Sequence, residues 1–392
     1  MKAVVIGSGR VGCGCAAQLL HDAGHEVWMI GRGAMIARLE RQRRFRLVLT
    51  DGRSSTERQI EIAGAVDHAD AAAARAAIAS ADLVCTAVGE PALAQVIPLL
   101  AAGLADAKHP VDVIGFENVE DAGSILAAGV RRQLGPAAGR HGYSGAVVDR
   151  VLAQRILPEA ADEPARILGE PGGDVTVDAT TLTGNLPPIA HLVPVEDFRA
   201  HYRRKLYRYS TGHATTAYLG RLKGYRELHT AIRDAEIRRF VLAAMDEGRI
   251  GLAHSYGAGV AGTRRDLESI VRRFENAAIG DTVARVGRDV PRKISRSERL
   301  VGAARLAARA GLVPVNLTRV VAAALHSSGD YSPCGDTAEL VSSLTGLARR
   351  HPLTALIAES WRALARAEAG TIPPLQRPTW AWEAPQPMAV AS

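Results

Sequence analysis

The 392-residue sequence contains no apolar run that approaches twenty residues, the length that a membrane-spanning helix requires. The apolar run at the N-terminus, residues 1–6, is short and leads directly into a glycine motif, which argues against a signal sequence. We therefore expect a cytoplasmic protein without a membrane-spanning segment.

Cysteine is scarce as well. The spacing of Cys13, Cys15, Cys85 and Cys334 does not match that of metal ligands. We expect these cysteines to be small, buried apolar residues without a redox role, and we expect no metal site.

Aromatic residues make up only 4% of the chain, so few side chains can stack on bases, although the net charge of +7 favours anionic partners. The arginines are scattered, and the sequence shows no nucleic-acid-binding motif. A basic site for a phosphorylated small molecule, together with an anionic cofactor, explains the charge without a nucleic-acid partner.

The first pattern that the sequence does contain is an apolar, partly β-branched run at residues 2–6, which predicts a strand. The motif Gly7-Ser8-Gly9-Arg10-Val11-Gly12 follows, and Val11, Cys15 and Leu19 continue at helical spacing. A strand, a glycine turn and a helix are the context that a dinucleotide-binding fingerprint requires, with the phosphates at the helix N-terminus. We expect a dinucleotide cofactor here; the alternative is a merely structural glycine turn.

The second predicted strand, residues 25–30, leads into Gly31-Arg32. An NAD enzyme normally carries an acidic residue here, which holds the adenosine ribose hydroxyls. A glycine removes the carboxylate that would repel a 2′-phosphate, and an arginine can pair with that phosphate. We therefore expect NADP rather than NAD; the alternative is that Arg32 points into water.

A further predicted strand, residues 82–89, should end under the cofactor, because ligands bind beyond the carboxyl ends of parallel strands. Its residues expected beside the nicotinamide ribose are Thr86, Val88 and Gly89. Another strand, residues 111–116, ends in Glu117-Asn118 at the same edge. A strand at residues 144–151 ends in Asp149-Arg150, which we interpret as a buried structural pair; the alternative is a direct contact with the substrate.

These elements predict an α/β fold, with an N-terminal Rossmann dinucleotide-binding domain (residues 1–190), a mostly α-helical substrate domain (191–372) and a Pro-rich C-terminal tail (373–392). Within the first domain, a hairpin at residues 45–63 should turn at Asp51-Gly52. Within the second, a helix containing Ile237 and Met245 should end at Asp246-Glu247-Gly248. Trp380 and Trp382 of the tail are expected to dock on the body of the protein.

Lys205 and His213 lie eight residues apart in a segment that predicts a helix. Eight residues are a little over two turns, so both side chains fall on one face. The segment should face the interior, where the pKa of a lysine falls toward neutrality, because its neighbours are apolar: Leu206, Ala214, Ala217 and Leu219. On spacing alone, a solvated or salt-bridged surface pair is the commoner outcome.

The run from Arg204 to Gly220, RKLYRYSTGHATTAYLG, resembles the signature of the polyol-specific long-chain dehydrogenases. That signature has an asparagine where this chain has Ser210. The family also has a TAVG run, which matches Thr86–Gly89, and usually an Asp at the position of Gly31.

Two more blocks, Arg273–Asn276 and Val286–Lys293, also match the family, so that the resemblance covers nearly the whole chain to about residue 360. It implies a metal-independent, monomeric enzyme that transfers a hydride between NAD(P) and a secondary alcohol or ketone of a sugar phosphate, of the mannitol 1-phosphate/fructose 6-phosphate type. It further implies that Lys205 acts as general acid/base, that His213 orients the substrate, and that Asn118 and Ser210 stabilise the negative oxygen.

Three cations lie within six residues at Arg288, Arg292 and Lys293 and can clamp a substrate phosphate. Arg288 is the strongest choice of the three. The alternative is a solvated basic loop.

Two other functions remain open. The side chain of Ser210 is shorter than that of the family's asparagine, so the substrate can differ in shape from fructose 6-phosphate. The protein can then be a diverged biosynthetic reductase of another sugar, cyclitol or nucleoside-linked phosphate. A non-catalytic NADP-sensing protein is the second alternative, but it would have no reason to keep Lys205, Asn118 and His213 together.

Overall fold

A computed structural model gives the structure of residues 1–160, 162–184, 186–368, 370 and 372. The chain divides into two compact units, Met1–His201 and a second that begins at Tyr202. The expected tail, with Trp380 and Trp382, lies outside the described residues. Among the helices of the described residues, none is long and apolar enough to span a bilayer.

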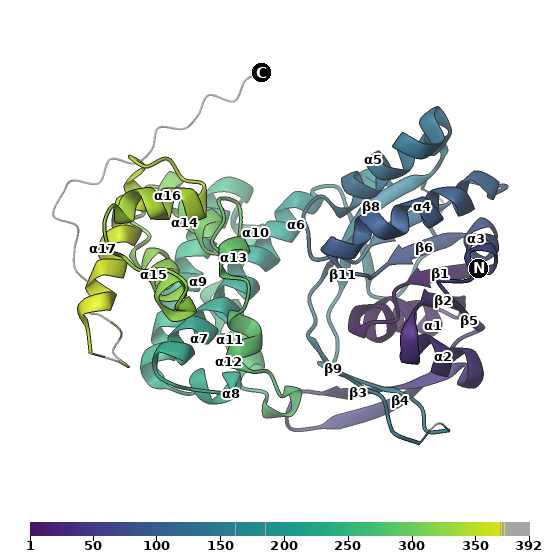
Figure 1. Cartoon of the computed structure of the whole chain (residues 1–392), viewed down its shortest axis with the longest axis horizontal. Coiled ribbons are helices and arrows are strands. Elements are labelled where there is room, and N and C mark those ends of the chain that lie inside the picture. The colour runs from purple at the N-terminus through teal and green to yellow at the C-terminus, as the bar shows by residue number, and fades with distance from the viewer. Residues whose placement is uncertain (161, 185, 369, 371, 373–392) are drawn as a thin grey trace. The chain divides into compact units, whose positions relative to one another are not determined.

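The described residues of the first unit contain an eight-stranded sheet with the order β12-β11-β8-β7-β6-β1-β2-β5 (Figure 1). Neighbouring strands pair in parallel except β8 and β11, which are antiparallel. The inner order β5-β2-β1-β6-β7-β8 is that of a dinucleotide-binding domain, with its change of direction between β1 and β6. The Rossmann prediction is therefore confirmed. The strands are β1 (Lys2–Ile6), β2 (Glu26–Gly31), β5 (Gly64–Asp67), β6 (Leu83–Thr86), β7 (Asp112–Gly115), β8 (Gly142–Val148), β11 (Val175–Asp178) and β12 (Leu192–Val195).

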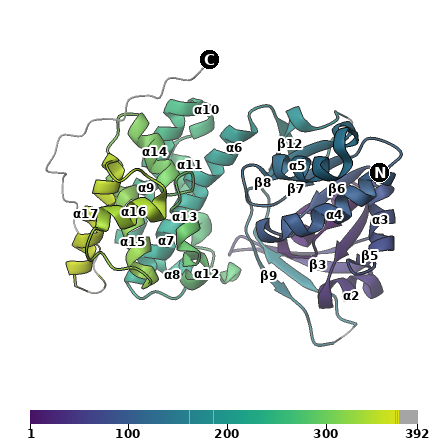
Figure 2. The ribbon, with the colours of Figure 1, turned by 45° about the horizontal axis from the view of Figure 1, so that its top comes forward.

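Helices cover both faces of this sheet (Figure 2), because successive side chains of a strand point to opposite sides. Ala3 and Val5 of β1 pack in one apolar cluster, and Val4 and Ile6 pack in the other. The first cluster contains side chains of a π-helical segment η1 (Gly12–Ala17), α1 (Gln18–Asp22) and α2 (Gly33–Gln42). The second contains side chains of α3 (Ala71–Ala79), α4 (Glu90–Asp106) and α5 (Ala122–Leu134). Short 3₁₀ segments lie at η2 (Gly135–Arg140) and η3 (Ala179–Thr181).

A smaller sheet in the first unit has the order β4-β3-β10-β9 among the described residues. Its strands are β3 (Arg44–Thr50), β4 (Ser55–Glu61), β9 (Leu152–Ile156) and β10 (Arg166–Gly169). The predicted hairpin is confirmed as β3 and β4, but the expected two-residue turn is wrong, because Thr50 pairs with Ser55 and four residues connect the strands. The Asp51 carboxylate accepts hydrogen bonds from the N–H groups of Arg53 and Ser54, which closes this longer loop.

The second unit is helical in its described residues, as expected. Its longer helices are α7 (Thr211–Leu222), α9 (Ala235–Tyr256), α11 (Arg264–Phe274), α14 (Val301–Arg309), α15 (Val315–Ser328), α16 (Thr337–Thr345) and α17 (Pro352–Arg366). Its shorter segments are α8 (Leu228–Ala231), α10 (Ala258–Ala261), η5 (Ala277–Ile279), α12 (Val283–Gly287) and α13 (Val290–Lys293). α6 (Phe198–Lys205) continues without interruption through a π-helical segment η4 (Leu206–Ser210) into α7.

The helix expected to end at Asp246–Gly248 instead continues to Tyr256, so that prediction is wrong. Gly248 is required for packing: a Cβ atom there would lie 2.6 Å from the carbonyl oxygen of Tyr207 in η4. A Cβ atom at Gly251 would likewise lie 2.6 Å from the backbone nitrogen of Ala307 in α14. The glycines of α9 therefore allow neighbouring backbones to approach closely.

Two further details differ from expectation. β8 ends at Val148 and leaves Asp149 exposed, so the pair that it was expected to form with Arg150 is not buried. Arg150 instead donates a hydrogen bond of 2.8 Å to Gln18. Three of the cysteines are buried as expected, but Cys334 is exposed.

Candidate active site

The glycine motif of the first unit forms a turn that other residues do not fit. Gly7 has a φ of +119°, and a Cβ atom there would lie 2.4 Å from the carbonyl oxygen of Ala87. A Cβ atom at Gly12 would lie 1.8 Å from the carbonyl oxygen of Gly7. These approaches hold the turn after β1 against the segment after β6, which is where a dinucleotide pyrophosphate binds in this fold.

A cavity opens beside this turn and is lined by residues from several of the predicted positions. Gly7, Ser8, Gly9, Arg32 and Val88 all contribute to its wall. The other predicted cofactor residues act differently: the Arg10 guanidinium donates to the carbonyl of Ala153, Val11 is partly buried, and Gly89 has a φ of +86°. The cavity and its glycine turn fit a dinucleotide, because Gly7, Ser8 and Gly9 bring backbone and small side chains to its wall.

The cavity is basic at the end of β2. Gly31 leaves room for the neighbouring serine, since a Cβ atom there would lie 2.6 Å from Oγ of Ser8. Arg32 is exposed, and His68 and Arg155 also line the cavity. Arg155 is held in place by a hydrogen bond of 3.3 Å from its Nη1 to the Ser8 carbonyl. Sequence reasoning found Arg32 but missed His68 and Arg155, because only the folded chain brings them to β2.

Glu117, expected only as the end of a strand, makes contacts that the sequence did not reveal. Its buried carboxylate accepts hydrogen bonds from Thr86 Oγ1 at 2.8 Å and from the Val88 N–H at 3.0 Å. Burial raises the pKa of Glu117, although these hydrogen bonds oppose the shift. The Thr86 hydroxyl therefore donates its hydrogen bond within the protein. Through both contacts, Glu117 connects the segment after β6 to the end of β7. Asn118, the next residue, is exposed.

In the second unit, the π-helical segment η4 lies between Lys205 and His213. In a regular α-helix, eight residues advance about 80° beyond two full turns, so the two side chains would diverge. A π-helical turn holds one extra residue, and the interval then has the phase of seven residues, about 20° short of two turns. Ser210, five residues after Lys205, falls within about 40° of it by the same count. The π segment therefore aligns Lys205, Ser210 and His213 more closely than sequence spacing predicts.

The environment of this face is mostly buried. Lys205 is half-buried, and Ser210 is only 5% exposed. The four apolar neighbours named from the sequence are all buried, as expected: Leu206, Ala214, Ala217 and Leu219.

His213 is held by a hydrogen bond that joins two segments of the unit. Its Nε2 lies 3.0 Å from Oδ2 of Asp281, and Arg285 donates two hydrogen bonds of 2.6 Å to the same carboxylate. Although burial favours its protonated form, the hydrogen bonds from His213 and Arg285 hold the pKa of Asp281 well below its usual range. Burial lowers the pKa of His213, against the opposing effect of Asp281.

The tautomer of His213 follows from this partner. An ionised carboxylate only accepts hydrogen bonds, so Nε2 of His213 must carry the proton that it donates to Asp281. In the neutral ring Nδ1 is then an acceptor. The ring lies 5.3 Å from that of Phe274 and 5.6 Å from that of Tyr209, centroid to centroid, which restricts its rotation.

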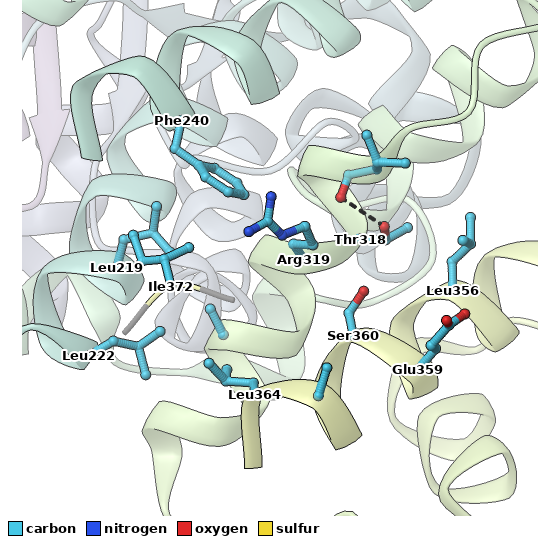
Figure 3. A pocket seen from close by; sticks show the side chains of 13 residues that line it. Leu219, Leu222, Phe240, Thr318, Arg319, Leu356, Glu359, Ser360, Leu364 and Ile372 are labelled. Atoms are coloured by element: carbon cyan, nitrogen blue, oxygen red, sulfur yellow. Dashed lines mark hydrogen bonds between the residues drawn. The ribbon is translucent and has the colours of Figure 1, made fainter. Parts of the chain in front are cut away.

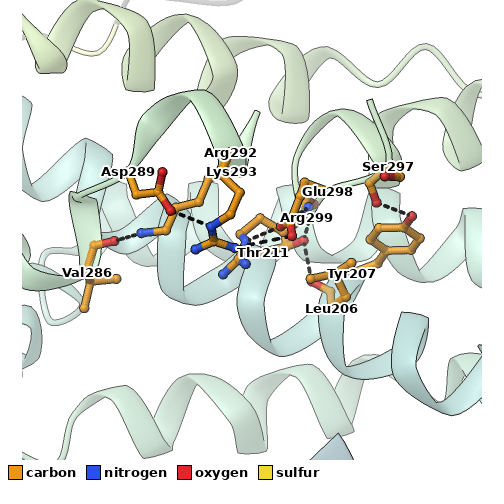
Figure 4. A network of polar contacts seen from close by, with 10 residues as sticks. All are labelled: Leu206, Tyr207, Thr211, Val286, Asp289, Arg292, Lys293, Ser297, Glu298 and Arg299. Atoms are coloured by element: carbon orange, nitrogen blue, oxygen red, sulfur yellow. Dashed lines mark hydrogen bonds and ion pairs between the residues drawn. The ribbon is translucent and has the colours of Figure 1, made fainter. Parts of the chain in front are cut away.

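The three predicted phosphate contacts lie in different environments, and Figure 4 shows two of them, Arg292 and Lys293. Arg288 is exposed. Arg292 forms ion pairs with Asp289 and, at 3.4 Å, with Glu298. Lys293 is 7% exposed, and its Nζ donates a hydrogen bond to the carbonyl of Val286.

Lys293 lies in a strongly cationic environment. Burial first, and then the charges of Arg299, Arg292 and Arg288, lower the pKa of Lys293 to about 7, while Asp289 opposes the shift. The charge of Lys293 also contributes to the lowered pKa of His213, so these two groups influence each other. A dianionic group bound here would restore the charged form of the lysine.

The predicted residues therefore assemble in two places. The glycine turn and Arg32 line one cavity of the first unit, and Asn118 belongs to that unit. Lys205, Ser210 and His213 share one helix face of the second unit, which also contains the basic segment. Sequence reasoning missed Asp281 and Arg285, although their spacing of four residues is a recognisable helical ion-pair signal. Among the described residues, no group of His, Cys, Asp and Glu side chains has the arrangement of a metal site.

Comparison with known proteins identifies the family on both units. Residues 1–191 match the mannitol dehydrogenase Rossmann domain, and residues 197–348 match the mannitol dehydrogenase C-terminal domain. The chain is 32% identical over 387 residues to mannitol-1-phosphate 5-dehydrogenase of Brevibacillus brevis, covering 93% of this chain and 98% of that protein. It is 34% identical over 380 residues to the enzyme of the same name from an Arthrobacter species, covering 91% and 97%.

Solved structures have the same fold. Mannitol 2-dehydrogenase of Pseudomonas fluorescens, in a ternary complex with NAD and D-mannitol, superimposes with a TM-score of 0.76 at 16% identity, covering 93% of this chain and 92% of that one. A substrate-free D-sorbitol dehydrogenase gives a TM-score of 0.77 at 15% identity, covering 95% and 94%. The resemblance seen in the sequence is thus confirmed: the chain belongs to the mannitol dehydrogenase family and is a nicotinamide-dependent polyol dehydrogenase of that family.

Proposed function

We propose that the protein catalyses reversible hydride transfer between NADP and a secondary alcohol or ketone of a sugar phosphate, of the mannitol 1-phosphate/fructose 6-phosphate type. The names of relatives at 32% and 34% identity support the substrate class. The helix face of Lys205, Ser210 and His213 is the observation that carries the proposal, because it retains the groups that this chemistry needs. We expect the protein to act as a monomer in the cytoplasm.

Lys205 is the proposed general acid/base. In the direction of oxidation, its uncharged amine takes the proton of the substrate hydroxyl as the hydride leaves the same carbon; in reduction, the protonated amine returns the proton to the oxygen. A nicotinamide cofactor would accept or supply the hydride, with its pyrophosphate held at the glycine turn. Lys205 is half-buried, so its amine can reach a bound substrate from within the unit.

His213 is the proposed orienting residue. Asp281 holds its Nε2–H, so its Nδ1 can accept a hydrogen bond from a substrate hydroxyl. The lowered pKa of His213 keeps the ring neutral, and therefore an acceptor, at physiological pH. Ser210 and Asn118 are the proposed donors to the substrate oxygen that becomes negative.

The substrate phosphate is assigned to the basic segment that ends in Lys293. Arg288 is exposed and can approach the phosphate directly. Arg292 shares its charge with two carboxylates, so we expect it to contribute less. Lys293, which is buried among arginines, gains a counter-charge when a phosphate binds, and this favours phosphorylated over neutral polyols.

The preference for NADP rests on the basic end of the cofactor cavity. Gly31 brings no carboxylate to this place, and Arg32, His68 and Arg155 line the same wall. Arginine is well suited to pair with the 2′-phosphate. An NAD-dependent enzyme of this fold normally has a carboxylate here instead.

Ser210 favours one alternative substrate. Since a serine hydroxyl is shorter than an asparagine amide, the reacting oxygen must lie closer to the helix or belong to a substrate of different shape. A biosynthetic reductase of another sugar, cyclitol or nucleoside-linked phosphate meets this condition with the same Lys205 chemistry.

Oxidation of NADPH and NADH by the purified protein, with fructose 6-phosphate as substrate, tests the proposal. Turnover with NADPH at a higher kcat/KM than with NADH is the expected result. Turnover only with another phosphorylated ketone would favour the alternative that Ser210 suggests. Turnover with free fructose at the same kcat/KM as with fructose 6-phosphate would contradict the phosphate assignment.

A further inference from the structure

A cavity in the second unit is not used by the proposed reaction. It lies among α7, α9, α15 and α17 (Figure 3). The volume open to the centre of a water molecule is about 40 Å³, which is room for roughly three waters. Most of its wall is apolar, with side chains from α7, α9, α17 and the segment after α17: Leu219, Leu222, Phe240, Leu356, Leu364 and Ile372.

One cation lies in this apolar wall. The guanidinium of Arg319 lies over the ring of Phe240, 4.5 Å from its centroid. Arg319 is half-buried, and burial lowers its pKa. Within the described part of the chain, no carboxylate forms an ion pair with it, and Glu236 and Glu247 act on it only through their charge at longer range.

This arrangement leaves hydrogen-bonding capacity in the cavity. A guanidinium has five N–H donors in a fixed plane, and stacking on an aromatic ring satisfies none of them. Taking a cation out of water is unfavourable unless a partner replaces the water. The donors of Arg319 therefore favour a planar, bidentate anion, and the leucines beside it favour an apolar group attached to that anion.

We propose that this cavity binds a small monocarboxylate with an apolar chain. The carboxylate pairs with Arg319, and a chain of about four to six carbons packs against Leu219, Leu222 and Leu364, given space for roughly three waters and an open mouth. The site lies on the second half of α7, away from the turn that carries His213.

A second charged side chain in the wall makes the charge of the ligand's head group testable. The carboxylate of Glu359 also lines the cavity, and in the view of Figure 3 the side chain of Ser360 lies between it and Arg319. A cationic amphiphile would use Glu359 instead. Hexanoate, 1-hexanol and hexylammonium each contain six carbons in an unbranched chain and carry an anionic, a neutral and a cationic head group, so they separate these cases.

The experiment is titration of the full-length protein with each of the three probes, followed by the shift in Tm and by calorimetry. Hexanoate is expected to bind and raise the Tm, because a ligand of the native state stabilises it by mass action. 1-Hexanol should bind about ten-fold more weakly, and hexylammonium should not bind.

Substitutions of Arg319 test whether its guanidinium binds the carboxylate of hexanoate. Arg319→Met should weaken hexanoate binding about ten-fold or more, while Arg319→Lys should retain part of it. Arg309→Met, which removes an exposed cation from the neighbouring α14, is the matched control and should leave binding unchanged.

Three results would overturn the proposal. The first is equal binding of hexanoate to the wild type and Arg319→Met, and the second is tighter binding of hexylammonium than of hexanoate. The third is hexanoate binding only to a chain shortened to end at Ile372, which would make residues 373–392 the native occupant. Because the readout is binding, failure here is independent of the dehydrogenase activity.

Discussion

Gly31→Asp, which places a carboxylate at the end of β2, tests the cofactor assignment directly. The wild-type glycine leaves this wall of the cavity without a negative charge and with Arg32, His68 and Arg155 around it. An aspartate should therefore convert a site for a 2′-phosphate into a site for ribose hydroxyls.

The structure predicts a steric cost for this change. A Cβ atom at residue 31 would lie 2.6 Å from Oγ and 3.0 Å from Cβ of Ser8, so the serine must move. Overpacking of this kind costs about 1–3 kcal/mol of stability. Ser8→Ala removes the closer of the two contacts, so the double variant Gly31→Asp/Ser8→Ala should regain most of the free energy of unfolding that the single variant loses.

The negative charge of an aspartate at residue 31 should weaken the binding of NADPH, which carries a 2′-phosphate, more than that of NADH. Two unit charges about 6 Å apart repel by about 2.8 kcal/mol at an effective dielectric constant of 20. Exposure and salt reduce this to roughly half, and 1.4 kcal/mol is a factor of about ten in affinity. NADPH should thus bind at least about ten-fold more weakly to the double variant, while NADH, which gains an acceptor for its ribose hydroxyls, should bind at least as tightly as before.

The assay is the Kd of each cofactor, from the change in nicotinamide fluorescence, together with urea unfolding of each variant. Gly139→Asp provides a matched control, because it adds the same charge at an exposed glycine of the same unit where a Cβ atom meets nothing within 4 Å. Unchanged NADPH affinity in the double variant would refute the placement of the adenosine ribose beside Gly31.

Four other substitutions or conditions test the remaining assignments. Lys205→Ala should lower kcat by about 10²–10⁴-fold without changing the Kd of NADPH; an equal loss in the Kd would mean a structural role. Asp281→Asn removes a carboxylate that favours the charged ring, so NMR titration should show a further fall in the pKa of His213; a rise would contradict the pairing. The pKa of Lys293 is about 7 in the folded protein and 10.5 in a free lysine. Between these pH values the unfolded chain therefore binds more protons than the folded protein. The free energy of unfolding should rise with pH in this range, by at most about 1.4 kcal/mol per pH unit. Urea unfolding at pH 7 and pH 9 should show this slope in the wild type and less of it in Lys293→Met. Gly248→Ala should cost about 1–3 kcal/mol in stability, because its new methyl group presses on the backbone of η4. It should also reduce kcat while NADPH still binds; an unchanged kcat would mean that this contact does not affect the proposed function of Lys205.

The first unit was predictable because its signals are local. A strand, a glycine turn and a helix occupy consecutive residues after Met1, and the sterics that require glycine at Gly7 and Gly12 act within a few residues or on the next parallel strand. The basic cavity wall was only partly predictable. Arg32 adjoins the turn in sequence, but Arg155 reaches Ser8 from β9, which no sequence spacing indicates.

The pair of His213 and Asp281 shows the same limit in the second unit. Each residue is ordinary in its own segment, and their distance of 3.0 Å depends on the packing of α12 beside α7. The effect on chemistry is substantial, since this contact selects the ring nitrogen that carries the proton.

The wrongly predicted end of α9 is linked to the alignment of the helix that carries Lys205 and His213. Asp246-Glu247-Gly248 has the composition of a helix end, yet Glu247 turns inward and accepts hydrogen bonds from the N–H groups of Asn316 and Leu317 at the start of α15. Gly248 meanwhile lets the Tyr207 carbonyl of η4 approach to a distance that any side chain would block. The wider π-helical turn is thus packed against a glycine that tertiary structure, rather than helix termination, requires. The residues that look like a break in one helix therefore support the irregularity in another, and that irregularity brings Lys205, Ser210 and His213 onto one face.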